Sequence, residues 1–344
     1  MTRLALVVPA DLDAPSGGNR YDRARARALA ELGTEVEQRL APGRWPMATS
    51  GERDRLAELL LGPDPVLVDG LLACGAPTAV ADAVDAGTRV HVLVHLPLAL
   101  ETGLSAQAAA DLDAREGRAL HAATGVLATS RWAADDLRAR HDLQGVITVA
   151  VPGTDPAPTA AGSTPPLLLH LASVTPRKDQ LTVVDALAQI RDLPWTADLT
   201  GPVNVDPGYA DQVQASIDRY GLADRIRLTG SRSGPELEAA WDATDLLLLP
   251  SHAETWGMAV TEALARGIPA VVGLGTGAEE ALGHAPDGSL PGAVVPPGDP
   301  GALAAALRDL LGPDRARAGA AASARGRGLS RWQDTARDVL EAVR

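Results

Sequence analysis

The stretch LLLLPSHAETWGMAVTEALARGIPAVV, residues 246–272, contains every part of a strand–helix–strand unit. Its run of leucines predicts a buried strand, and the Pro-Ser dipeptide after it predicts a turn. A helix is expected to begin near Gly257, to carry Glu262 on its second turn, and to end at the Gly-Ile-Pro break before another apolar run. Neighbouring parallel strands need such a helical crossover, so the stretch predicts an α/β fold.

The same alternation of short apolar runs and longer periodic segments continues in both directions. Strands are predicted in the first half at 4–8, 66–69, 90–96, 125–130 and 145–151, and in the second half at 167–173, 198–201, 226–230, 246–250, 270–274 and 293–297. A segment rich in Pro, Gly, Ser and Thr at 152–166 separates the two halves and is typical of a linker. The pattern therefore predicts two doubly wound, Rossmann-like parallel-sheet domains.

The domains are predicted at residues 1–155 and 156–329, followed by a C-terminal helix at 330–344. That helix is expected to pack on one of the two domains. One of these options is a return to the first domain. Ligands of open parallel sheets bind beyond the carboxyl ends of the strands. Two such domains are therefore expected to face a central cleft that holds the site.

Composition limits the partners and the compartment. A chain of 344 residues with a formal charge of −13 is long enough for two cores and repels nucleic acid and anionic membranes on average. Its single cysteine, Cys74, cannot form an internal disulfide and is expected to be buried packing. The N-terminus does not resemble a secretory signal, and no apolar run approaches the ~18 residues of a membrane span. A cytoplasmic protein without a strong membrane signal is expected.

Two glutamates provide the strongest chemical signal. Glu254 lies in the loop before the predicted helix at 257, and Glu262 lies on that helix. Carboxylates in such positions accept hydrogen bonds from the vicinal hydroxyls of a sugar and a ribose. A helical separation of about 12 Å exceeds the ~6.5–9.5 Å of inverting glycosidase pairs, which argues against a hydrolase. The alternative is a solvated loop residue and a solvated helix face.

A lysine provides the second signal. The stretch LLLHLASVTPRKDQLTVVDAL, residues 167–187, predicts a strand, a Pro-containing turn and a helix beginning near Asp179. A helix N-terminus attracts anions, and Lys178 beside it offers a mobile ammonium. Of the 31 Lys and Arg residues, Lys178 is the one lysine, which is unexpected for an ordinary surface position. Lys178 is therefore a candidate diphosphate ligand, with Arg177 as a second candidate.

Two weaker signals lie in the first half. Gly17 and Gly18 are expected in a polar turn before a helix that starts near Arg20, where the backbone could approach a phosphate. The turn lacks the G-x-G-x-x-G spacing of nicotinamide-binding folds. His95 closes a predicted strand and is a candidate for contact with a sugar hydroxyl, whereas His91 within the strand is expected to be a core residue.

Metal chemistry finds no support in the spacing of ligand-type residues. Cys74 lacks a nearby His or Cys partner, and the other histidines considered do not form a ligand cluster: His170, His252 and His284. The expectation is an enzyme without a metal or another cofactor.

Several blocks together resemble glycosyltransferase family 4, the retaining GT-B-fold enzymes, over nearly the whole chain. The segment 250–271 resembles the family's two-glutamate motif, with Trp256 at its aromatic position. LASVTPRKD, residues 171–179, is similar to the block Gly-Arg-Leu-x-Pro-x-Lys-Gly. VPGTD at 151–155 is similar to the interdomain block Pro-Asn-Gly-Val-Asp, and residues 292–307 resemble the segment after the nucleotide pocket. The chain departs from the pattern at Ser173, where the family usually has an arginine that grips the diphosphate.

The resemblance implies a set of site residues. It implies His95, Lys178 and Glu254 as the catalytic group. It implies a donor site made by the following residues: Gly17, Gly18, Ser173, Arg177, Lys178, Glu254, Thr255, Trp256, Gly257, Met258 and Glu262. The first domain is then the acceptor side, and the second binds the nucleotide sugar.

The resemblance also implies a reaction: transfer of a hexose from a nucleoside diphosphate sugar to a hydroxyl with retention, by a metal-independent front-face mechanism. A UDP-sugar is favoured over a GDP-sugar because no residue singles out a guanine edge. A small soluble metabolite or natural product is favoured as the acceptor, because no basic amphipathic helix marks a lipid-facing surface. The alternatives are a sugar-nucleotide epimerase of the same fold and a non-catalytic protein that binds a sugar nucleotide.

Overall fold

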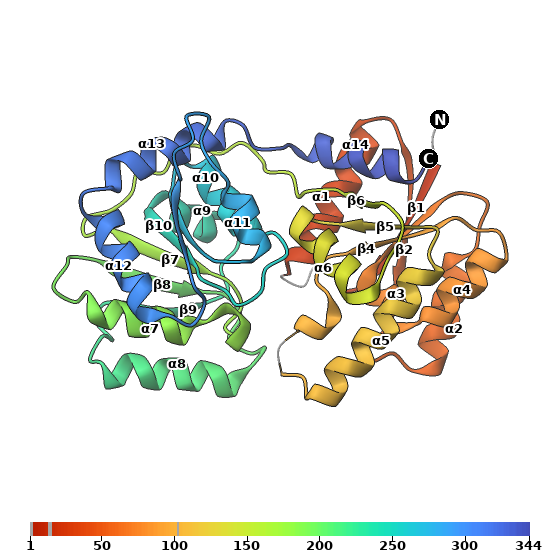
Figure 1. Ribbon diagram of the computed structural model, residues 1–344, viewed down its shortest axis with the longest axis horizontal. Helices are drawn as coiled ribbons and strands as arrows, with labels where there is room; N and C mark the ends of the chain where they lie inside the picture. The colour runs from red at the N-terminus through yellow and green to blue at the C-terminus, as the bar shows by residue number, and fades with distance from the viewer. Residues whose placement is uncertain (1–2, 13–15, 102) are drawn as a thin grey trace. The chain divides into compact units, whose positions relative to one another are not determined.

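The computed structural model describes residues 3–12, 16–101 and 103–344, and the chain divides into two compact units (Figure 1). Unit 1 comprises Met1–Gly153 together with Ser330–Arg344, and unit 2 comprises Thr154–Leu329. Each unit contains a six-stranded sheet whose strand pairs are all parallel. The predicted fold class, α/β with two Rossmann-like parallel-sheet domains, is confirmed.

The sheet of unit 1 has the strand order β2-β1-β3-β4-β5-β6. Its strands are β1 (Arg3–Pro9), β2 (Glu35–Ala41), β3 (Val66–Asp69), β4 (Val90–Val94), β5 (Gly125–Ala128) and β6 (Ile147–Val149). Its helices are α1 (Gly17–Glu31), α2 (Ser50–Leu60), α3 (Gly70–Gly75), α4 (Pro77–Asp85), η1 (Leu98–Leu100), α5 (Ala106–Ala122), α6 (Arg131–His141) and α14 (Trp332–Ala342). The order changes direction between β1 and β3, which defines a topological switch point.

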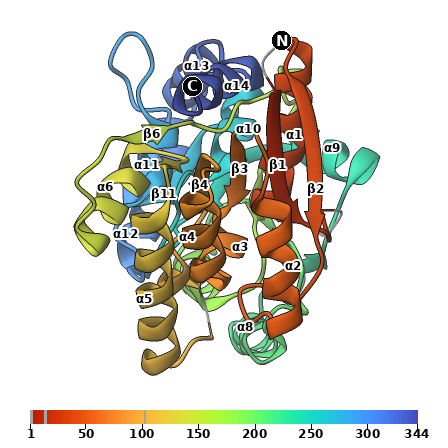
Figure 2. The same ribbon diagram turned by 90° about the vertical axis from the view of Figure 1, so that its right-hand side faces the viewer.

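Strand β2 was missing from the sequence prediction. Its sequence EVEQRLA is mostly polar, and only Ala41 is buried. It pairs with β1 alone and forms the edge of the sheet (Figure 2), so it has fewer neighbours to bury its side chains. An apolar run is therefore not required for this strand, which explains why the pattern did not reveal it.

Helix α1 begins earlier than predicted. It starts at Gly17 instead of near Arg20, so the expectation that Gly17 and Gly18 lie in a turn is wrong. The reason is an N-cap: Oγ of Ser16 accepts a hydrogen bond from the backbone N–H of Asn19 at 3.0 Å. Both glycines therefore lie in the first turn of the helix.

The C-terminal helix α14 belongs to unit 1 and packs beside α1 on one face of the sheet (Figure 2). The rings of Tyr21 and Trp332 meet edge to face with centroids 5.5 Å apart. Oγ1 of Thr335 donates a hydrogen bond to the carbonyl of Val151 at 2.6 Å. Helices α2, α3, α4 and α5 pack on one another against the other face. The last residues of the chain thus complete the first unit.

The sheet of unit 2 has the strand order β12-β11-β10-β7-β8-β9, with its switch point between β7 and β10. Its strands are β7 (Leu167–Leu171), β8 (Thr196–Thr200), β9 (Ile226–Gly230), β10 (Thr244–Leu249), β11 (Ala270–Gly273) and β12 (Gly292–Val295). Its helices are η2 (Pro176–Lys178), α7 (Gln180–Gln189), α8 (Pro207–Arg219), α9 (Gly234–Asp242), α10 (Met258–Ala265), α11 (Gly277–Leu282), α12 (Pro300–Leu311) and α13 (Arg315–Gly326). All six predicted strands of this half are present.

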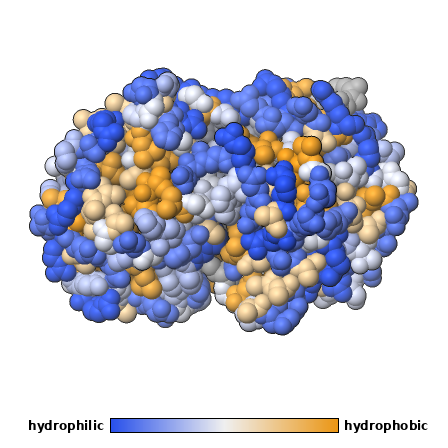
Figure 3. Space-filling view, in the orientation of Figure 1, coloured by the Kyte–Doolittle hydropathy of each residue, from blue (hydrophilic) through white to orange (hydrophobic). Residues whose placement is uncertain are grey.

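The cores follow from these layers. In unit 2, α7, α8 and α12 share one cluster of buried apolar residues, and α10 packs with α11 and α13. The face of the molecule in Figure 3 is largely hydrophilic, with apolar side chains in separate small areas. Within the described residues, no helix combines the length and the apolar character that a membrane crossing requires.

Candidate active site

The switch point of unit 2 brings together two residues that the sequence analysis treated separately. Lys178 ends η2, which follows β7, and Glu254 lies in the loop after β10. Strands β7 and β10 are parallel neighbours in the sheet, so the two loops leave it side by side at the carboxyl ends of the strands. The Lys178 ammonium donates a short hydrogen bond to Oε1 of Glu254.

The Glu254 carboxylate is buried and multiply held. Oγ of Ser251 donates to the same oxygen, Oε1, at 3.1 Å. Burial by itself would raise the pKa of Glu254, but the charges of Lys178 and Arg177 outweigh it and leave that pKa below its usual value. Glu254 is therefore a carboxylate at neutral pH, able to accept hydrogen bonds from hydroxyls.

The backbone of Lys178 is held from beneath by His170 on β7. Nε2 of His170 lies 3.0 Å from the carbonyl oxygen of Lys178, and the imidazole is fully buried. Burial lowers the pKa of His170 to about 4, so the ring is neutral at pH 7 and donates its Nε2 hydrogen to that carbonyl. The sequence analysis considered His170 only as a metal ligand. Its place on a strand whose loop carries Lys178 was the signal for this supporting role.

Arg177 and Ser173, the candidates next to Lys178, also form hydrogen bonds within the protein. Nη1 of Arg177 donates to the carbonyl of Ala253 at 3.1 Å, which links the same two loops. Ser173 is half-buried, and its carbonyl accepts a hydrogen bond from Nε2 of Gln180 at 2.9 Å. Their proposed contacts with a diphosphate remain predictions.

The rest of the predicted donor set lies around the start of α10. Gly257 is its N-cap, with φ +80°, and Met258 is its first residue. Trp256 is buried before this cap, and Thr255 is half-buried. Glu262 lies buried on the second turn of α10, as the spacing predicted. The peptide N–H groups of the first turn give this helix end its affinity for anions.

A second cluster lies at the switch point of unit 1. His95 follows β4, Asp69 ends β3, and Asp22 lies on α1, which follows β1. Strands β1, β3 and β4 are consecutive in the sheet, so these side chains meet at one edge. Nε2 of His95 lies 3.2 Å from Oδ1 of Asp22 and 3.5 Å from Oδ2 of Asp69. The position after a strand, which pointed to His95, would also have pointed to Asp69.

The electrostatics of this cluster depend on a buried arginine. Nη2 of Arg25 lies 2.9 Å from Oδ1 of Asp22, and both side chains are almost fully buried. Burial raises the pKa of Asp69, and burial alone would also raise that of Asp22, but Arg25 and His95 bring the Asp22 pKa below its usual value. Burial alone would lower the pKa of His95, yet the two carboxylates raise it. The cluster therefore favours a protonated imidazole.

The two glycines of α1 differ in their surroundings. A Cβ atom on Gly18 would lie 3.3 Å from Cδ2 of His95, whereas a Cβ atom on Gly17 would meet nothing within 4 Å. Gly18 thus lets the helix approach the imidazole closely. The sequence analysis had both glycines as phosphate contacts, and for neither does the structure contain a test of that role.

Among the residues that the structure describes, two groups of side chains each offer three ligand-type atoms within 4.8 Å of one another. The first is the Asp22, Asp69 and His95 cluster. The second, Asp113, Glu116 and His141, lies between α5 and α6. Nη2 of Arg25 lies 2.9 Å from Oδ1 of Asp22 beside the first group, and within the second Nε2 of His141 lies 3.0 Å from Oε2 of Glu116. Asp22 and Glu116 thus each already have a partner within the protein.

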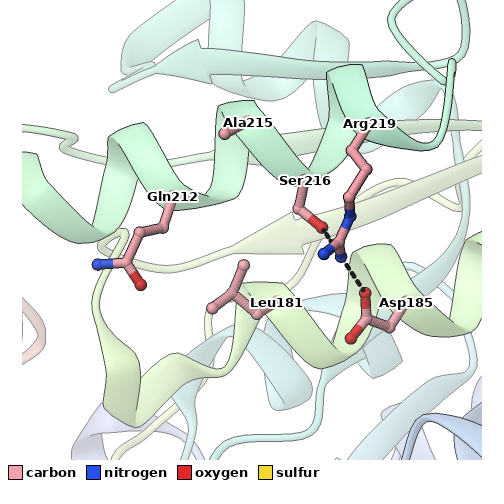
Figure 4. Close-up of a pocket in the computed structure, with 6 residues that line it drawn as sticks. All are labelled: Leu181, Asp185, Gln212, Ala215, Ser216 and Arg219. Atoms are coloured by element: carbon pink, nitrogen blue, oxygen red, sulfur yellow. Dashed lines mark hydrogen bonds and ion pairs between the residues drawn. The ribbon is translucent and has the colours of Figure 1, made fainter.

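The buried residues outside the sites are as expected. Cys74 is fully buried, and His91 is buried with its pKa lowered to about 4 by burial, as suits core residues. A cavity of about 350 Å³ between α7 and α8 lies on the flank of unit 2 (Figure 4). Its lining includes Leu181 and the ion pair of Arg219 with Asp185 at 3.6 Å, so it is separate from the switch point.

Comparisons with known proteins agree with this architecture. The family model "Glycosyl transferases group 1" matches residues 153–327. A D-inositol 3-phosphate glycosyltransferase of Kineococcus radiotolerans is 32% identical over 224 residues, which cover 58% of this chain and 51% of that protein. The matched part thus spans about half the length of this relative, and 24% to 42% of the length of four others of the same name.

Solved structures resemble the chain over its full length. A sucrose-phosphate synthase of Thermosynechococcus elongatus has a TM-score of 0.79 at 21% identity, covering 99% of this chain and 98% of that one. Anabaena HepE in complex with UDP-glucose has a TM-score of 0.80 at 17% identity, covering 99% of each chain. At these identities the likeness establishes the fold. The family match over half of the sequence establishes more: the chain belongs to the group 1 family of glycosyl transferases.

Proposed function

We propose that the protein is a retaining glycosyltransferase of family 4 that transfers a hexose from a nucleoside diphosphate sugar to a hydroxyl. One observation carries the proposal: Lys178 and Glu254 meet at the switch point of the unit 2 sheet. This edge is where open parallel sheets bind nucleotides, and both residues lie within the region that matches the family model.

The proposed roles follow from the chemistry of the side chains. Lys178 and the N-terminal turn of α10 stabilise the diphosphate as it leaves, as fixed donors do for a developing anion. Glu254 accepts hydrogen bonds from hydroxyls of the donor sugar, and Glu262 from those of the ribose. For His95 in unit 1 we propose a contact with a hydroxyl of the transferred sugar.

In the proposed reaction, the bond between the anomeric carbon and the diphosphate oxygen breaks while the acceptor oxygen bonds to the same face of that carbon. The leaving diphosphate takes the acceptor's proton, so the protein contributes positioning and charge. We propose that this step is independent of metal ions.

A UDP-sugar is the favoured donor, and the HepE structure that contains UDP-glucose supports it as the first compound to try. The favoured acceptor is a small soluble hydroxyl compound in the cytoplasm. A relative named for D-inositol 3-phosphate makes that compound a reasonable first acceptor.

The experiment is a metal-free thermal-shift panel of UDP-, GDP-, ADP- and dTDP-glucose on the wild type, Lys178→Ala and Arg219→Ala. A ligand at a hundred times its Kd adds about 2.7 kcal/mol of stability. One nucleotide sugar is expected to stabilise the wild type and Arg219→Ala, whose exposed cation lies away from the site, but not Lys178→Ala. Absence of any shift for the wild type would contradict the proposal.

A turnover assay with the bound donor then separates the enzyme classes. A transferase consumes the donor only with an acceptor or water and yields a product with the donor's anomeric configuration, which NMR reads directly. An epimerase would convert the donor sugar without an acceptor, and a binding protein would leave it unchanged. Either of these results would overturn the transferase assignment.

A further inference from the structure

Asp179, directly after Lys178, has an unusual backbone conformation. Its φ is 60° and its ψ is 42°, in the left-handed region. Among the described residues, Asp142 is the other non-glycine residue with positive φ. Such a conformation costs free energy and persists where surrounding contacts enforce it.

The carboxylate of Asp179 does not cap the helix that Asp179 begins. Asp179 is the N-cap of α7, and an aspartate there ordinarily accepts a hydrogen bond from an N–H of its own helix. Here Oδ2 instead accepts the backbone N–H of Gly298 at 3.0 Å, and it lies 3.3 Å from Nε2 of His252. The side chain is 9% exposed, so these partners replace most of its hydration.

These contacts join three loops at one edge of the unit 2 sheet. Asp179 belongs to the loop after β7, His252 to the loop after β10, and Gly298 to the loop after β12. His252 binds the β7 loop twice, because its backbone N–H also donates to the carbonyl of Arg177 at 2.9 Å. Asp179, His252 and Gly298 together form a clasp, which ties the β7 loop to two neighbouring loops at the residue after Lys178.

We propose that Asp179 is a positioning residue that, through this clasp, holds Lys178 where the donor diphosphate binds. The inference rests on the proposed function. Lys178 has a long, flexible side chain, and its affinity for an anion depends on how little freedom it loses on binding. Because the β7 loop is tied to two neighbouring loops, the Lys178 ammonium is already oriented before the diphosphate binds. Part of the conformational entropy that binding would otherwise cost is therefore lost during folding instead.

Three variants separate positioning from general stability. Asp179→Gly suits the left-handed backbone but removes the carboxylate. Asp179→Asn tolerates the same backbone and keeps an oxygen for the Gly298 N–H. Asp299→Ala is the matched control, because Asp299 lies in the β12 loop but caps α12 through the N–H of Ala302 at 2.9 Å.

The measurement is the Kd for UDP, and for GDP if UDP does not bind, by isothermal titration calorimetry. Asp179→Gly is expected to weaken binding about tenfold through loss of preorganisation, while Asp179→Asn stays within about threefold of the wild type. Asp299→Ala is expected to lower the melting temperature but to bind within about twofold of the wild type. In a Lys178→Ala background, Asp179→Gly is expected to cause no further loss, since it acts through Lys178.

The outcomes are distinguishable. Equal UDP affinity of the wild type and Asp179→Gly would overturn the inference and leave the proposed function intact. An additional loss of affinity in the Lys178→Ala background would show that Asp179 does not act through Lys178, which also overturns it. If Asp179→Gly does not fold, His252→Ala replaces it with an expected loss of about threefold, and unchanged affinity there contradicts the clasp. A wild type that binds neither nucleotide would contradict the proposed function and this inference together.

Discussion

The Lys178 ammonium and the Glu254 carboxylate form an ion pair although 76 positions separate them in the chain. Their side chains are only 12% and 9% exposed. The pair exists because β7 and β10 are adjacent, so the loops that follow them share one edge of the sheet. Each of these charges therefore compensates for the burial of the other.

Removing one member of the pair should destabilise the protein more than removing both charges. Lys178→Met leaves Glu254 buried beside Ser251 without its cation, and is expected to cost about 3 kcal/mol. Adding Glu254→Gln should restore part of that loss, with a coupling of about 1–3 kcal/mol. Urea unfolding of the wild type, both single variants and the double variant measures the coupling. Strictly additive losses would show that the pair does not contribute.

The neutral His170 imidazole predicts a pH dependence of stability. Its pKa is lowered to about 4, against about 6.5 in an unfolded chain, so the unfolded chain binds the proton first as the pH falls. The contribution of the neutral His170 to the free energy of unfolding is thus fully present above pH 6.5. It declines as the pH falls toward 4, by about 2 kcal/mol at pH 5.

The variant His170→Gln provides the control for that dependence. Glutamine can still donate to the carbonyl of Lys178 but does not titrate. Its urea-unfolding free energy should therefore fall less than that of the wild type between pH 7 and pH 5. Equal pH dependence for the two proteins would exclude His170 as the titrating group.

Gly18 and Gly17 form a matched pair for testing the place of His95. Gly18→Ala puts a Cβ atom 3.3 Å from Cδ2 of His95, so the imidazole must move by a few tenths of an ångström. We expect the rate of sugar transfer to fall about tenfold from such a displacement. Gly17→Ala meets nothing within 4 Å, should add about 0.5 kcal/mol of stability through helix propensity, and should slow transfer less than Gly18→Ala does. Equal rates for the two variants would contradict a role for His95 in transfer.

Gly153 controls the docking of α14. A Cβ atom there would lie 2.2 Å from the backbone nitrogen of Trp332, so Gly153→Ala forces the segment before α14 away from unit 1. We expect a cost of about 1–3 kcal/mol and faster proteolytic release of α14. Gly145→Ala in the same unit meets nothing within 4 Å and should stay within about 0.5 kcal/mol of the wild type. A Gly153→Ala variant as stable as Gly145→Ala would contradict the close approach.

The central strands β7, β10 and β11 of unit 2 were predictable because they are largely apolar runs that a parallel sheet buries on both faces. Strand β2 was not, because an edge strand can be mostly polar. The start of α1 was misplaced because glycines suggest a turn, whereas the Ser16 cap that begins the helix there depends on backbone geometry. Glu262 was placed correctly on α10, since helical spacing is a local property.

By itself, the sequence determined the α/β class, the parallel sheets and the loops that carry Lys178, Glu254 and His95, since periodicity and position after a strand are local in the chain. Only the tertiary structure decided which loops meet. Strand order is set by packing between distant segments, and it joins Lys178 to Glu254 and surrounds His95 with buried carboxylates. Burial then sets the charges of these groups, because a pKa depends on neighbours that the chain brings together only by folding.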